Sequence, residues 1–384
     1  MVALRIGHRA PRLSTVGAAR ITLLAALLVA LLAAVVVPAA AEVSPEVSID
    51  IYNSLLIGDE VAPGETVAAT GAATAQLDLR NSGSRDVRSW FQLRSTLAHR
   101  ADGSPATMVD VPRAEVRWRM TAGESYTMRY TAGRTRLTWG DGVLYNAGDV
   151  LNGAAPDATD LTADTLREET LWLLSAYFPL GRFSFMEPVL LVPMGRLAAD
   201  STTAGSGEDS AGTATTAPVT TARPASEVGA GGRMQGQVGG IKSEVGYLYR
   251  GTTDDHRPYL SLQGNLVVDW YGGGSWSSST EDWVITGGVV YNGSTDRRGS
   301  WSARTEALWE SDTTEAHLFP ELSWSPSQLF SLFVRGITSS HGDAVNGAAG
   351  FTWTPSTGLS LALYGTTDTD REVGAVTTAV TYVF

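Results

Sequence analysis

The strongest constraint on this chain is its last twelve residues, in which apolar and polar side chains alternate up to an aromatic end. The run reads Val373-Gly-Ala-Val-Thr-Thr-Ala-Val-Thr-Tyr-Val-Phe384. Val376, Val380, Tyr382 and Phe384 share one parity, so a strand would point all four to the same face. We therefore expect the chain to end in a strand with one apolar, aromatic face.

Short alternating segments of this kind recur along the whole chain, separated by turn residues, at about the length that a tilted membrane strand needs. The candidates lie at 47–56, 73–81, 87–98, 111–119, 125–138, 169–178, 183–194, 242–250, 258–270, 282–292, 299–310, 315–324, 329–338, 345–353, 358–367 and 373–384. The pattern predicts an all-β fold, a transmembrane antiparallel up-and-down β-barrel of about 14–16 strands within a range of roughly 12–18.

The connections between these segments sort by length. In an outer-membrane barrel that starts and ends in the periplasm, the periplasmic turns are short and the outer loops are long. Even-to-odd connections such as Pro179–Arg182 and Pro355–Thr357 are tight, whereas the odd-to-even connections include Gly58–Ala72, Trp139–Glu168, Leu197–Arg233 and Tyr271–Glu281. This sorting supports the barrel independently of the strand pattern.

The first 41 residues are typical of a secretory signal peptide. Four arginines precede any acidic residue, Ile21–Val37 is continuously apolar, and Ala39–Ala41 supplies a small-residue cleavage site. The alternative is an uncleaved membrane anchor, for which the apolar stretch is short. We expect residues 42–384 to form a single mature barrel.

Charge and composition exclude several classes of function. The net charge of −12 becomes −16 once the four signal-peptide arginines are removed, which argues against nucleic acid as a partner. Cysteine is absent, so thiol nucleophiles and zinc–thiolate sites are excluded. The histidines lack metal-ligand spacing, and Ser340-His341-Gly-Asp343 reads as a turn, so we predict no enzymatic activity, no metal and no cofactor.

Parity also predicts the two faces of the wall. In 111–119, arginines and Glu115 alternate with apolar residues, and an arginine facing lipid near the bilayer midplane would cost roughly 2–4 kcal/mol. The charged set must therefore face a polar lumen. The arginines that we expect to line the pore are Arg88, Arg94, Arg113, Arg117, Arg119, Arg129 and Arg136. They form either a structural, charge-paired ladder or a wall that selects solutes, and the sequence leaves both open.

Two sequence features resemble known outer-membrane proteins. The terminal Tyr382 and Phe384 resemble the assembly signal of Gram-negative outer-membrane β-barrels. The stretch 136–152 resembles a W-G-[DE]-G…N-P-x-D segment of uncharacterised, porin-like outer-membrane barrels, although Ala147-Gly148 stands where that pattern has Pro and a free position. The matching positions are Trp139, Gly140, Asp141, Gly142, Asn146, Asp149 and Val150. The resemblance implies the outer membrane of a diderm bacterium, with lipid and the barrel-assembly machinery as partners.

The segment 139–168 departs from strand patterning. Its length and place predict either a functional loop or one that folds into the lumen, as the constriction loop of general porins does. By that analogy Asp141 and Asp149 would oppose the arginines, and residues 162–169 read as a capped helix. The alternative is a tight Trp-Gly-Asp-Gly turn with structural aspartates.

The segment 198–232 is rich in Ser, Thr, Ala, Gly and Pro and predicts a disordered outer loop; an interdomain linker is the competing interpretation. Together these features favour an outer-membrane pore for passive passage of small polar solutes. A non-conducting structural or adhesive barrel is the alternative, and a barrel-embedded hydrolase is a distant third.

Overall fold

The computed structural model describes residues 43–62, 65–81, 86–101, 104–122, 126–156, 160–163, 165–192, 228–251, 253–294, 299–340, 345–369 and 372–384. The predicted signal peptide and most of the predicted outer loop, 198–227, lie outside these ranges. All described strands belong to one compact unit, Glu42–Phe384. Among the described residues, no helix is long and apolar enough to cross a membrane.

Eighteen antiparallel strands form the fold. The first nine are β1 (Val43–Ala62), β2 (Glu65–Asn81), β3 (Val87–His99), β4 (Pro105–Ala122), β5 (Tyr126–Thr135), β6 (Leu171–Pro179), β7 (Phe185–Leu191), β8 (Gly229–Val238) and β9 (Ile241–Arg250). The others are β10 (Asp255–Asn265), β11 (Asp269–Trp276), β12 (Trp283–Ser294), β13 (Ser300–Glu310), β14 (Ala316–Ser327), β15 (Phe330–Ser339), β16 (Val345–Ser356), β17 (Leu359–Asp368) and β18 (Val373–Val383).

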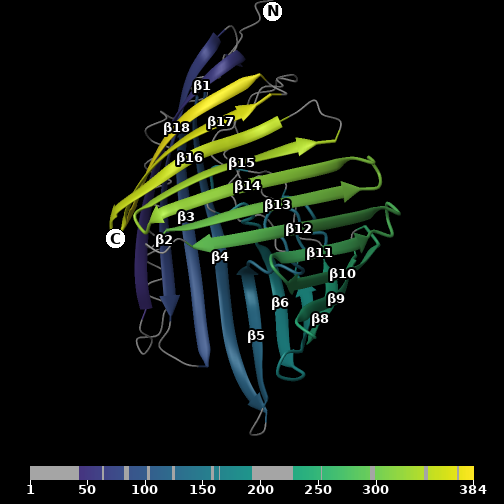
Figure 1. The fold of residues 1–384 in the computed structure, drawn as a ribbon. Coiled ribbons are helices and arrows are strands. Elements are labelled where there is room, and N and C mark those ends of the chain that lie inside the picture. Colours follow the sequence, from purple (N-terminus) through teal and green to yellow (C-terminus); the bar gives the residue numbers. More distant parts are fainter. Residues whose placement is uncertain are drawn as a thin grey trace, which may run out of the picture. The chain divides into compact units, whose positions relative to one another are not determined.

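Each strand pairs with its neighbours in sequence, and β18 pairs with β1, which closes the sheet into an up-and-down barrel. Figure 1 follows this order around the wall from purple to yellow. The closing seam runs from Ser48 opposite Val383 to Gly58 opposite Val373, and the Phe384 amide donates to the Val47 carbonyl at 2.8 Å. The predicted fold class is confirmed, with a strand count at the upper limit of the predicted range.

Two of the eighteen strands have no counterpart among the sixteen predicted segments. β8 contains four glycines and β11 contains three, and glycine carries no side chain from which alternation could be read. Gly229–Gly232, predicted as loop, therefore belong to β8. Overlooking β8 reversed the predicted directions of β9 and β10, and overlooking β11 restored the parity from β12 onward.

Three smaller predictions about the connections were wrong. β1 and β2 continue to Ala62 and from Glu65, through most of the predicted loop 58–72. β5 ends at Thr135, three residues before the predicted limit. The described part of 162–169 contains no helix; a single turn closed by Asp160 replaces it, because its carboxylate accepts the Thr162 amide at 2.8 Å.

The two faces of the wall follow the predicted parity. Val376, Val380 and Tyr382 of β18 and the following residue, Phe384, are exposed on the outer face. The rings of Tyr382 and Phe384 meet edge to face at 4.4 Å. On β4, Glu115 is buried on the lumen face, whereas its neighbour Val116 is exposed on the outer face. An apolar exterior around a charged interior is the arrangement that lipid outside and water inside require.

The adjacent residues Val380 and Thr381 test this assignment, because they lie on opposite faces of β18. Val380→Arg should lower the yield of folded, heat-modifiable barrel, since a lipid-facing arginine costs about 2–4 kcal/mol near the midplane and less toward the interfaces. Thr381→Arg is the matched control and should be tolerated, because Thr381 lies opposite Asp50 on the lumen side. Equal assembly of the two variants, scored by gel mobility with and without boiling, would contradict the assignment.

Candidate functional site

The segment between β5 and β6, residues 136–170, folds into the barrel and contacts two separate groups of strands from inside. Trp139, Val150 and Leu151 pack against a wall cluster from β6, β7, β9 and β10. Leu144 and Tyr145 pack against Leu308, Phe319 and Ala348 of β13, β14 and β16. A single segment can reach strands so far apart around the barrel only through its interior, so the segment lies across the lumen.

One buried glutamate of β13 fixes the middle of this lumen segment. Glu306 is fully buried, and its carboxylate accepts the backbone amides of Val143, Leu144 and Tyr145 at 2.9, 2.8 and 2.8 Å. The hydroxyl of Tyr271 donates to the same carboxylate. Hydrogen bonds to an ionised acceptor are about twice as strong as neutral ones, so these contacts hold three otherwise unpaired amides.

A second buried glutamate, on β9, fixes the start of the segment in the same way. Glu244 accepts the Gly140 amide at 2.7 Å and the Tyr259 hydroxyl at 2.6 Å. Arg233 of β8 pairs with Glu244 at 3.1 Å and donates to the Thr138 carbonyl at 3.2 Å. Arg233 therefore compensates the charge of Glu244 inside the barrel.

Glycines on the wall make both tyrosine contacts possible. Gly246 lies directly opposite Tyr259, and Gly288 lies directly opposite Tyr271. Each tyrosine ring lies over its glycine so closely that a Cβ atom would overlap ring atoms. The rings can therefore lie along the wall and bring their hydroxyls to the glutamates, which a larger residue opposite would prevent.

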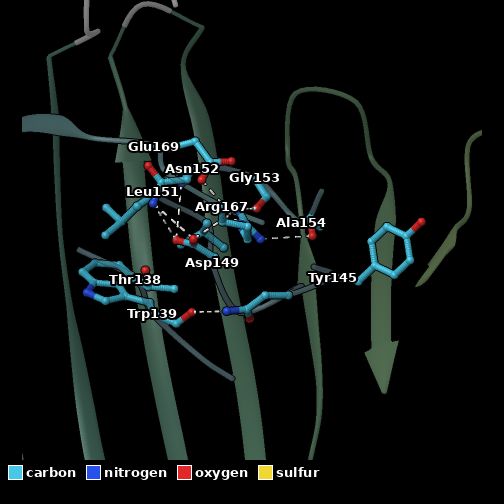
Figure 2. A network of polar contacts seen from close by, with 12 residues as sticks. Thr138, Trp139, Tyr145, Asp149, Leu151, Asn152, Gly153, Ala154, Arg167 and Glu169 are labelled. Atoms are coloured by element: carbon cyan, nitrogen blue, oxygen red, sulfur yellow. Dashed lines mark hydrogen bonds and ion pairs between the residues drawn. The ribbon is translucent and has the colours of Figure 1, made fainter. Parts of the chain in front are cut away.

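A polar network inside the segment holds Asp149, as Figure 2 shows. The Asp149 carboxylate pairs with Arg167 at 3.2 Å and accepts the Asn152 side-chain amide at 3.1 Å. Arg167 also donates to the carbonyls of Gly153 and Ala154 at 2.6 and 3.3 Å. Burial raises the pKa of Asp149 to about 6, although Arg167 and Asn152 pull it in the opposite direction.

The predicted opposition of Asp141 and Asp149 to the arginine wall is not what the structure shows. Asp149 is buried among residues of its own segment, where it pairs with Arg167. Asp141 pairs with Lys242 of β9 at 2.8 Å, away from β3–β5. The other motif residues are structural neighbours of this turn: Asn146 donates to the Trp139 carbonyl at 2.9 Å, and Gly140 and Gly142 adopt positive φ angles of 69° and 148°.

Five of the seven predicted pore-lining arginines line one cavity of about 340 Å³ beside the start of the segment. They are Arg88, Arg117, Arg119, Arg129 and Arg136. Arg233 also lines the cavity, and the two carboxylates of its lining belong to Asp86 and Glu187. We call this space the arginine cavity.

Two predicted arginines lie outside the arginine cavity. Arg94 pairs with Glu168 of the lumen segment at 3.6 Å. Arg113 pairs with Glu115 at 3.2 Å, and its guanidinium lies 3.6 Å from the centre of the Trp90 ring. These two fit the structural ladder that the sequence left open.

Sequence reasoning assigned no role to Glu306, Glu244, Arg167 or Arg233. Alternation in β9 marks Glu244 as lumen-facing, yet no local pattern identifies a backbone amide 104 residues earlier as its partner. Within the described residues, no group of three or more His, Asp or Glu side chains is arranged to hold a metal ion.

No protein-family profile matches the sequence, and no curated protein is similar enough to count as a relative. The fold resembles that of Pseudomonas aeruginosa OccK2 (OpdF) in complex with glucuronate, with 9% identity, a TM-score of 0.55 and coverage of 91% of this chain and 99% of that one. It also resembles P. aeruginosa OccK9 (OpdG), with 8% identity, a TM-score of 0.54 and coverage of 89% and 98%. Both neighbours are Gram-negative outer-membrane porins, and at this identity the likeness shows the fold alone.

Asp149 makes the stability of the folded protein depend on pH. Because its pKa in the folded protein, about 6, lies above the ordinary value of 3.8, the protonated form fits the site better. This contribution to stability is fully present below about pH 4 and is lost as the pH rises through 6. The unfolding temperature of the detergent-solubilised protein should therefore fall between pH 4.5 and 7.5 by more than that of Asp149→Asn.

Asp141→Asn is the matched control, because it removes a carboxylate of the same segment whose partner is partly exposed. It should keep the pH dependence of the parent between these two pH values. Parallel melting profiles for the parent and Asp149→Asn would show that Asp149 does not titrate in this range.

Proposed function

We propose that this protein is a pore-like barrel of the outer membrane of a diderm bacterium, through which small polar solutes pass by diffusion. The observation that carries the proposal is the arginine cavity, a water-accessible, charged space inside a closed barrel whose exterior is apolar. Lipid contacts the outside, and the lumen segment narrows the passage inside. The likeness to the two OccK barrels supports the architecture of this proposal.

The charge of the passage favours anions. Six arginines and two carboxylates line the arginine cavity, and Glu187 is already bound to Arg233 at 2.7 Å. The two aspartates that the sequence suggested would cancel the arginines are bound elsewhere, by Lys242 and Arg167. We therefore propose a clear anion preference, in place of the weak one that opposing aspartates would produce.

A second candidate function, a non-conducting structural barrel, is favoured by one observation. The lumen segment is fixed to β9 and β13 by the buried Glu244 and Glu306 and packs into two apolar clusters. A segment held this firmly would leave the barrel closed if no path remained beside it.

Conductance in planar bilayers separates the two functions. The parent should form anion-preferring channels, and Arg117→Ser with Arg119→Ser should move the reversal potential toward cation preference. Deleting 141–158 should raise the single-channel conductance because it removes most of the segment. Glu306→Ala should do so more modestly, with the segment still present, since it releases three amides. If neither the parent nor the two segment variants conduct, the structural barrel replaces the pore.

We further propose that the terminal strand is read by the barrel-assembly machinery, with Tyr382 and Phe384 as the recognised face. Both rings are exposed on the outer face at the seam where β18 meets β1. Deleting Phe384 should reduce the amount of folded barrel in the outer membrane without changing export across the inner membrane. Unchanged folded protein in outer-membrane fractions would exclude this role.

A further inference from the structure

The arginines of the arginine cavity are arranged as like charges face to face. Arg88 on β3 lies directly opposite Arg117 on β4, and Arg119 on β4 lies directly opposite Arg129 on β5. Like charges at directly opposed positions of an antiparallel pair destabilise it. Two such pairs in consecutive rows of one wall therefore raise the free energy of the folded barrel unless anions compensate them.

The protein itself supplies little compensation. Among the described residues, Arg88, Arg119, Arg129 and Arg136 have no carboxylate within ion-pair distance, and Arg117 has only Glu115 at 3.2 Å. The Arg129 guanidinium lies 3.9 Å from the centre of the Tyr177 ring, which orients it without neutralising it. Elsewhere in the barrel the pattern differs: carboxylates pair with Arg113, Arg134, Arg167, Arg233 and Arg304.

The spacing of the arginines suits a ligand with more than one charge. Arg117 and Arg119 are two residues apart on one strand, so their Cα atoms are separated by about 6.6–6.8 Å, and neighbouring strands lie about 4.8 Å apart. A monovalent anion neutralises only one of the two positive charges of a pair, whereas a multiply charged oxoanion can neutralise more than one arginine and bridge both rows. Guanidinium groups bind phosphate oxygens in bidentate geometry, and 340 Å³ falls within the usual size of small-ligand sites.

We propose that the arginine cavity is a saturable binding site for soluble, multiply charged oxoanions of the diphosphate class. The side chains face the lumen, so the ligand is a solute and not a lipid headgroup. Arg88, Arg117, Arg119 and Arg129 bind it from the wall, and Arg136 binds it from the root of the lumen segment. This inference deepens the proposed function, because it names the solute class that the passage retains.

The carboxylates that share the arginine cavity limit where the anion binds. Glu187 is held by Arg233 at the β7–β8 side, so a ligand there would have to displace it. Asp86 precedes β3 at the turn end of the cavity, next to Arg119, whose amide donates to the Asp86 carbonyl at 2.8 Å. The bound anion therefore lies among the guanidinium groups of Arg88, Arg117, Arg119, Arg129 and Arg136, away from both carboxylates.

Calorimetric titration of the full-length, detergent-solubilised protein with inorganic pyrophosphate at constant ionic strength tests this site. Pyrophosphate should bind saturably, and acetate should bind at least about tenfold more weakly. Arg119→Gln with Arg129→Gln should weaken pyrophosphate binding by about tenfold or more. Without added anion the same double variant should melt at a higher temperature than the parent, because a repulsive pair is removed.

Arg182→Gln is the matched control, since it removes an exposed arginine from the neighbouring β6–β7 turn without touching the cavity. Its affinity for pyrophosphate should equal that of the parent. Arg88→Gln provides an independent cavity variant and should weaken binding as well.

Three results would overturn the proposal: no saturable pyrophosphate binding to the folded parent, acetate binding as tightly as pyrophosphate, or equal loss of affinity in Arg182→Gln and the cavity variants. The measurement is independent of conductance. Binding without channels would reject the pore and keep the site, whereas channels without binding would reject the site and keep the pore.

Discussion

The hydrogen bonds that two buried glutamates accept from the lumen segment determine the interior of this barrel. A segment that leaves the sheet and crosses the lumen loses the strand partners of its backbone amides, and each buried amide left unpaired costs about 1–3 kcal/mol. Glu306 and Glu244 supply acceptors for four of these amides. The wall thus supplies hydrogen-bond acceptors to the backbone of the segment, as a neighbouring strand does within a sheet.

This solution imposes its own requirements on the wall. A buried carboxylate is costly unless it is fully hydrogen-bonded, so each glutamate also needs a tyrosine hydroxyl. Each tyrosine can deliver that hydroxyl only by lying over a glycine on the next strand. Gly246 of β9 and Gly288 of β12 carry no side chain to stabilise their strands, but they allow the tyrosine contacts that hold the segment.

The lumen segment divides the arginines of the barrel interior into two groups. Where the segment packs, arginines are enclosed with carboxylates and carbonyl groups, as Arg167 and Arg233 are. Beside the root of the segment the wall stays open to water, and the arginines there face one another. Water screening is what allows the second arrangement to persist, and it also leaves those guanidiniums available to solutes.

The sequence predicted those features of the fold that depend on local periodicity. Alternation located sixteen of the strands, the polar face and the arginines of β3–β5, because each of these follows from a pattern that repeats every two residues. It failed at β8 and β11, where glycines remove the signal, and it misplaced Asp149, whose partner was decided by the fold of the segment. The contacts of Glu244 and Glu306 join residues more than a hundred positions apart and have no local signature.

The lumen segment and the wall meet at the arginine cavity. Arg136 and Leu137, which begin the segment, line the cavity together with Arg233, and Arg233 also holds the Thr138 carbonyl and Glu244. An anion in the cavity therefore changes the field at the residues that anchor the segment. Because charges interact more strongly where protein excludes part of the water, this coupling is larger than it would be across open solvent. The arginines that we propose to bind a solute are thus adjacent to the segment that we propose to limit its passage.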